Sequence, residues 1–174
     1  MATLTPYEVA VAIVDCAYAA VDHVAPNAIN RKGVVPGEIA WDDCQCGQLV
    51  ISENRRYGSR NFPLEEIDHS AECGEPWIVV EYTLSLTRCV PGPTANGKSP
   101  AIADLQSAAQ QLSEDMTNTR RAVMCCLTTL YEEMGAGSKI EAFELGQQNT
   151  VGPQGDCAGH ELLIFVGWTQ DCGC

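Results

Sequence analysis

The chain has 174 residues, and its 23 acidic against 10 basic side chains give a formal net charge of −13. So acidic a chain is a poor candidate for binding nucleic acid or an anionic membrane surface, because both contacts depend on Lys and Arg. Hydrophobic residues make up 45% of the chain, which is typical of a globular protein and excludes wholesale disorder. The length predicts a single domain over residues 1–174.

Neither a membrane span nor a signal peptide is predicted. No stretch of the sequence reaches the roughly 18 consecutive apolar residues of a transmembrane helix. The apolar run from Val9 to Val14 lacks a preceding basic segment, has Glu8 where a positive charge is expected and is followed by Asp15. These features favour a product of the cytosol without a targeting segment.

The first predicted element is an amphipathic helix over residues 5–24. Thr5 suits the N-cap, Pro6 the first helical position and Glu8 the capping-box position. Apolar residues then recur at helical spacing until Pro26 ends the pattern.

The next part of the chain is punctuated by prolines and glycines. Residues 25–46 predict an irregular segment, a strand is expected at about 47–54, and residues 55–76 predict a long polar loop. Three of the ten basic residues lie in this loop, within six positions. On so acidic a chain they are candidate contacts to an acidic neighbour, either another subunit or a protein of a larger assembly. These residues are Arg55, Arg56 and Arg60.

The second half of the sequence gives the clearest patterns. Residues 77–90 alternate between apolar and polar, as in a half-buried antiparallel strand. A long helix is predicted over about 100–134, with Ser99 as its cap and Pro100 at the first helical position. Its apolar residues form one stripe, expected to face one partner along the whole helix. The stripe comprises Ile102, Leu105, Ala109, Leu112, Met116, Thr119, Val123, Cys126 and Leu130.

Two further strands are predicted, over about 139–147 and 160–169, and the glycines and Pro153 between them indicate a loop. The predicted element order is therefore α-β-β-α-β-β. It indicates an α+β fold in which two helices pack on a small, mainly antiparallel sheet.

The segment Gly92–Ser99 fits the phosphate-binding loop pattern G-x-x-x-x-G-K-[ST] between a strand and a helix. A nucleotide-binding enzyme is therefore one alternative. Several features count against it, because Pro93 and Pro100 lack N–H groups that such a loop uses to hold phosphate. The strand before the loop also alternates, whereas the parallel strand of a phosphate-loop fold is a continuous apolar run.

Ten cysteines are unusual for a chain without a secretion signal. Zinc binding by the pairs Cys44/Cys46 and Cys172/Cys174, disulfides and reduced thiols all remain open, although C-x-C is not the common zinc spacing. The three histidines are scattered, no G-x-S-x-G is present, and no catalytic residues are predicted.

Helical spacing makes some disulfides more plausible than others. Cys16 lies on the apolar stripe of the first helix and Cys126 on that of the second, so the two meet if both helices cover the same side of the sheet. Cys125 is one residue off the stripe and is an alternative partner. A second candidate pair is Cys73 with Cys89, which would clip the long loop to its strand, and ten reduced thiols are the remaining possibility.

Several blocks of the sequence resemble a cysteine-rich family encoded among the head–tail joining genes of long-tailed phages of actinobacteria. The most specific is the W-D-D-C-x-C-G-Q-L motif at the end of the segment Val35–Leu49. The others are the Cys125-Cys126 pair, Val151–Cys157 and Gly167–Thr169. The resemblance covers nearly the whole chain, and the predicted element order also looks like the tail-terminator fold, which is a small sheet with helices on one side.

The resemblance implies a structural virion protein rather than an enzyme, with no catalytic residues, cofactor or metal. A tail terminator forms a hexameric ring that caps the growing tail tube and then docks with the connector below the head. Its implied partners are copies of itself, the tail tube protein and the connector or stopper proteins, while DNA passes through the lumen without specific binding. Such a protein assembles in the host cytoplasm and stays in the virion neck. A head-completion or stopper protein of the same neck is the nearest alternative.

Overall fold

The computed structural model describes residues 4–21, 28–37, 47–65, 77–93, 96–133 and 140–169. These residues form an α+β fold with two helices and a five-stranded sheet. The element order, α-β-β-β-α-β-β, has one strand more than the sequence predicts. The elements are α1 (Pro6–Ala20), β1 (Arg31–Val35), β2 (Gln48–Ser59), β3 (Trp77–Cys89), α2 (Ile102–Glu133), β4 (Ile140–Gln154) and β5 (Cys157–Thr169).

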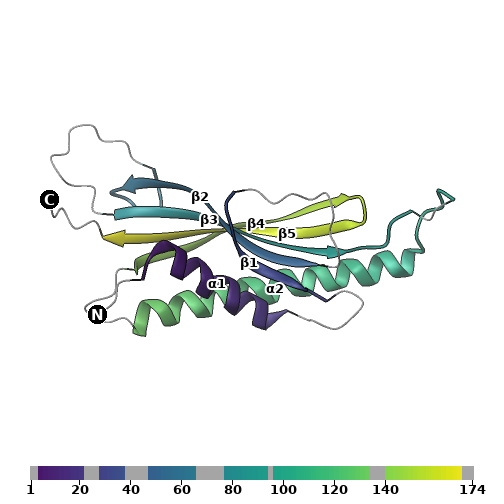
Figure 1. Ribbon diagram of the computed structural model, residues 1–174, viewed down its shortest axis with the longest axis horizontal. Helices are drawn as coiled ribbons and strands as arrows, with labels where there is room; N and C mark the ends of the chain where they lie inside the picture. The colour runs from purple at the N-terminus through teal and green to yellow at the C-terminus, as the bar shows by residue number, and fades with distance from the viewer. Residues whose placement is uncertain are drawn as a thin grey trace.

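The sheet has the strand order β1-β2-β3-β5-β4. β1 runs parallel to β2, and the other three pairings are antiparallel. Both helices cover the same face of this sheet (Figure 1). The core lies between them and contains one side of β3 and β5, on which every second residue is buried. The predicted class, a small and mainly antiparallel sheet packed by two helices, is confirmed at this level.

α1 begins as the sequence predicts and ends earlier. The Thr5 hydroxyl accepts from the Glu8 amide at 3.3 Å, and the Glu8 carboxylate accepts from the Thr5 amide at 2.6 Å, which completes the capping box. The helix ends at Ala20, because Val21 is already extended. The predicted continuation to residue 24 is therefore wrong at Val21, and residues 22–24 lie outside the described residues.

α2 lies close to its predicted bounds but begins two residues late, and its apolar stripe is buried only in part. The Leu105 amide donates to the Ala101 carbonyl, so the helix starts after Ala101, and the predictions of Ser99 as the cap and Pro100 at the first helical position are wrong. Val123 and Leu127 are fully buried, whereas Ile102 is 71% and Leu105 37% exposed. The first turns of the helix extend past the ends of the strands in Figure 1. The expectation of one partner along the whole stripe is therefore wrong within this chain, because the first turns of α2 lie beyond the strands that the rest of the helix covers.

The predictions for the first two strands need correction. β1 lies in the segment that the sequence predicts to be irregular. The sequence does not predict this strand because it is short, lies at the edge of the sheet and does not alternate between apolar and polar residues. β2 runs on to Ser59, so Arg55 and Arg56 belong to a strand and not to a loop. A register shift between Glu53 and Arg55 keeps the strand paired with β3 beyond the predicted end.

β4 and β5 form one long hairpin in place of two short, separated strands. Gly155 and Asp156 make its turn, and Gly155 adopts a positive φ of 58°, which favours glycine. Pro153 is tolerated inside β4 because this is the edge strand and its register shifts there. The glycines and proline that predicted a loop mark an irregularity within a strand.

Candidate functional site

The two arginines of β2 do not form one patch. They are consecutive residues of a strand, so their side chains leave opposite faces of the sheet. Arg55 pairs with Glu81 at 2.9 Å and with Glu65 at 2.5 Å, and these carboxylates raise its pKa. Arg56 pairs with Glu53 at the same end of the sheet.

The charges of Arg55 and Arg56 are thus matched within the chain. Arg60, the third basic residue of the predicted contact loop, lies exposed just beyond the end of β2. All three arginines lie at one end of the sheet, but a role in subunit contacts would compete with the ion pairs that Arg55 and Arg56 already make. Their assignment as contact residues stays a prediction.

The phosphate-loop pattern has an acidic residue packed against it. A Cβ placed on Gly92 would collide with the carboxylate of Asp156, so this carboxylate lies directly on the loop backbone. The Val90 amide donates to the backbone carbonyl of Asp156 at 2.7 Å, which holds the two segments together. A carboxylate in this position repels phosphate, and β3 before the loop is antiparallel to both of its neighbours. The geometry therefore disfavours a nucleotide site.

The helix-packing argument for a disulfide has a counterpart in the structure. Cys16 and Cys126 are joined, with their Cα atoms 6.2 Å apart, so the bond ties α1 to α2. Cys125, the alternative partner of Cys16, is an exposed thiol. Cys157 is also disulfide-bonded.

The second candidate pair, Cys73 with Cys89, stays a prediction. The chain leaves β2 opposite Trp77, where β3 begins, and Cys89 is at the far end of β3. Twelve residues of extended chain separate these two ends by about 40 Å. Cys73 itself lies outside the described residues.

A buried ion pair lies between β3 and α2 and was not predicted. Arg88 and Asp115 are 2% and 1% exposed and make two hydrogen bonds, of 2.5 Å and 3.0 Å. The alternation of β3 contains the signal that was missed, since Arg88 continues the buried series of Leu84 and Leu86. A charged residue at such a position predicts a buried partner, but not which one.

His160 of β5 completes this buried polar cluster. It is fully buried, and neither ring nitrogen has a hydrogen-bond partner among the described residues. Burial lowers its pKa to about 4, and the positive charge of Arg88 acts in the same direction, while Asp115 opposes both. Because all three side chains are sealed from solvent, the cluster is suited to fixing how α2 sits on the sheet and not to binding a substrate.

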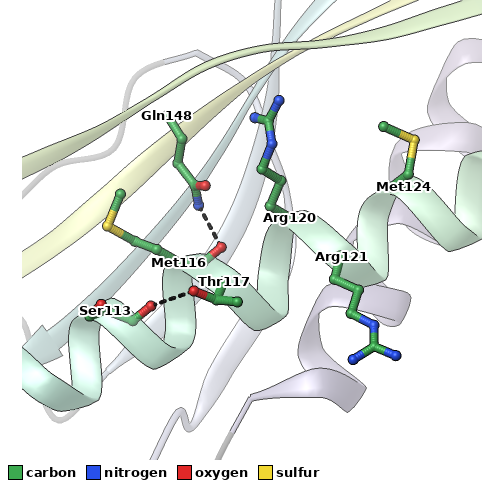
Figure 2. Close-up of a pocket in the computed structure, with 7 residues that line it drawn as sticks. All are labelled: Ser113, Met116, Thr117, Arg120, Arg121, Met124 and Gln148. Atoms are coloured by element: carbon green, nitrogen blue, oxygen red, sulfur yellow. Dashed lines mark hydrogen bonds between the residues drawn. The ribbon is translucent and has the colours of Figure 1, made fainter.

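A surface hollow of about 560 Å³ lies on the outer side of α2, next to β4. Figure 2 shows Arg120 reaching toward the strands and Arg121 pointing to the opposite side of the helix. Arg120 donates to the carbonyls of Gly146 at 2.8 Å and Leu145 at 3.1 Å, which fixes its position. The hollow is lined by Ser113, Met116, Thr117, Arg120, Arg121, Met124 and Gln148.

The lining of this hollow suits a protein surface better than a reaction. It has two cations, two flexible methionine side chains and no carboxylate. The two hydroxyls that line it include that of Thr117, which donates to the Ser113 carbonyl at 3.0 Å (Figure 2). Such a site complements an acidic or apolar partner, and no sequence pattern indicated it.

The motif behind the phage resemblance is described only at its end. Gly47 has a φ of +99°, and a Cβ there would lie 2.6 Å from the Ala28 carbonyl, so the backbone requires glycine. Gln48 and Leu49 then begin β2, and both are buried. The four cysteines of the zinc alternative lie outside the described residues, so that alternative stays untested.

Within the described ranges, no group of three or more His, Cys, Asp and Glu side chains is placed to hold a metal ion. In the same ranges neither helix is long and apolar enough to cross a membrane. A comparison with protein-family models and one with curated proteins both return no match.

Proposed function

We propose that this chain is a structural protein of the neck of a long-tailed phage, namely a tail terminator that caps the tail tube as a ring and joins it to the head connector. The proposal rests on the sequence resemblance, and one structural observation supports it. Both helices lie on the same face of a five-stranded sheet, which is the arrangement that the resemblance implies.

Two rival functions are less well supported. A stopper or head-completion protein of the barrel type would need a closed sheet, whereas β1 and β4 form the two edges of this one. A nucleotide-binding enzyme would need an anion-binding loop at Gly92–Ser99, whereas Asp156 presents a carboxylate to that loop. Calorimetry with ATP tests the second rival, and we expect no binding.

The cysteines agree with a virion protein. Virions assemble in a reducing cytosol and then persist in oxidising surroundings, where a bond such as Cys16–Cys126 is stable. The net charge of −13 also suits a ring through which DNA passes without binding, because like charges repel.

The proposal is tested by deleting the gene from its phage and by labelling virions with an antibody against the chain. We expect label at the junction of head and tail, and a deletion lysate that contains unjoined heads and tails of irregular length. Joined virions with tails of normal length in the deletion lysate would contradict the proposal.

A further inference from the structure

The first turns of α2 present an apolar surface that no other part of the described chain covers. Residues 101–107 are all exposed, and they include Ile102, the most exposed large hydrophobic residue of the described chain. Leu105 follows three positions later, on the same side of the helix. Residues 101–112 contain a single charged side chain, that of Asp104. We call residues 101–109 the helix start.

The hollow on the same helix has a complementary character. Met116 and Met124 supply apolar surface, and Met124 is 42% exposed. Arg121 forms no ion pair with any described residue, in contrast to Arg55, Arg56 and Lys32. The hollow is thus partly apolar and positively charged, and Arg121 has no acidic partner within the described chain.

We infer that the hollow of one copy receives the helix start of a second copy of this chain. Two copies that each have a net charge of −13 repel one another, so a contact between them is favoured where acidic side chains do not face each other. The hollow has cations and no carboxylate, while the helix start is apolar and its one charge is acidic. The contact would bury Ile102 and Leu105 against the methionines and bring carboxylate charge toward Arg121.

This inference rests on the proposed function and adds to it the surface through which the ring closes. The helix start and the hollow are different surfaces, so the contact is head-to-tail and each copy retains one free surface for the next. Their centres are about 14 residues apart on one helix, or roughly 20 Å along its axis. A head-to-tail contact that repeats and closes gives a ring rather than a two-fold dimer.

Photo-crosslinking of the full chain tests the contact. A photoreactive amino acid replaces Ile102 in protein labelled with ¹⁵N, which is mixed with unlabelled protein before assembly and illumination. We expect crosslinked peptides that join labelled position 102 to unlabelled residues 113–124. The same amino acid at Asn118, which is exposed on α2 but does not line the hollow, is the control and is expected to give no such link.

Three substitutions test the same contact through the mass of the assembled particle. Ile102→Glu and Met124→Glu are each expected to abolish the ring, and Asn118→Glu is expected to retain it. A mixture of the first two variants has one intact helix start and one intact hollow, so it is expected to give one-to-one heterodimers. All three sites are exposed, and unfolding curves like that of the wild type confirm that the variants fold.

The docking inference is overturned if links from position 102 map to another segment or to another protein, or if Met124→Glu assembles like the wild type. These outcomes leave the proposed function standing when the antibody still labels the virion neck. A ring that closes through this contact but is missing from the neck would overturn the proposed function alone.

Discussion

The two halves of α2 share one apolar period and have different surroundings. From Asp115 to Leu127 the helix packs against α1 and the sheet, and its buried residues include Asp115, which pairs with Arg88, and Cys126 of the disulfide. From Ile102 to Ala109 the apolar stripe of the same helix faces solvent. The comparison shows that periodicity identifies the face of a helix that will be covered, but not whether its own chain or another one covers it.

The largest expected effect is in the packed half of α2. Asp115→Ala removes the partner of Arg88 and leaves a guanidinium uncompensated in a site that is 2% exposed. We expect the free energy of unfolding to fall by about 3–5 kcal/mol. Urea unfolding measures it, with Asp104→Ala in the exposed half as the control, for which a change within about 0.5 kcal/mol is expected. Equal losses of unfolding free energy in Asp115→Ala and Asp104→Ala would contradict the distinction between a packed and an exposed half of α2.

The disulfide is the second test of the packed half. Cys126→Ala opens a link between residues 110 positions apart, and we expect a loss of about 2–4 kcal/mol under oxidising conditions. Cys125→Ala changes the exposed neighbour and is expected to have little effect. Under reducing conditions the wild type is expected to lose stability and approach Cys126→Ala. Identical unfolding of the wild type with and without reductant would contradict this prediction.

Acid is expected to act on the same buried cluster through His160. Its pKa is about 4 in the fold, below the ordinary value of 6.5, so the unfolded chain binds the proton more tightly. The contribution of His160 is therefore fully present above pH 6.5 and is lost as the pH falls toward 4, by up to about 3 kcal/mol. The measurement is the difference in unfolding free energy between the wild type and His160→Leu at several pH values. A difference that does not vary between pH 7 and pH 4 would contradict the assignment.

The smallest expected effect is at the far end of β2, where the ion pairs are exposed to solvent. Arg55→Ala removes the pairs with Glu81 and Glu65, and we expect stability to change by less than about 1 kcal/mol. Thermal unfolding in low and high salt measures the change, which should shrink in high salt because exposed charges are screened. A loss as large as that of Asp115→Ala would show that this end of the sheet depends on its charges.

Local rules predicted the elements whose stability is decided locally. The capping box at Thr5, the position of β3 and the approximate length of α2 follow from neighbouring residues, and the structure confirms them. The predicted half-buried alternation of β3 is not kept from Leu84 to Arg88, where every residue is buried. β1 and the ends of β2 and β4 were missed, because their pairing depends on strands that are distant in the sequence. Gly152 and Pro153 predicted a loop, although an edge strand accommodates both at an irregularity.

The residues of the candidate site were harder to predict from the sequence than the helices and strands, because their surroundings are set by tertiary structure. The arginines of residues 55–60 stand out in the sequence, yet Arg55 and Arg56 point to opposite faces and are matched by glutamates. Arg121 does not stand out, because its significance comes from the absence of a carboxylate around the hollow. The sequence gives the positions of the charged residues along the chain, whereas only the fold shows which of these charges are paired.

A reconstruction of the assembled neck tests the central claim most directly. The account predicts that copies of this chain form a closed ring in which Ile102 of each copy is buried against Met116, Met124 and Arg121 of the next. A monomer or a two-fold dimer at this position, or a ring in which Ile102 faces solvent, would contradict it.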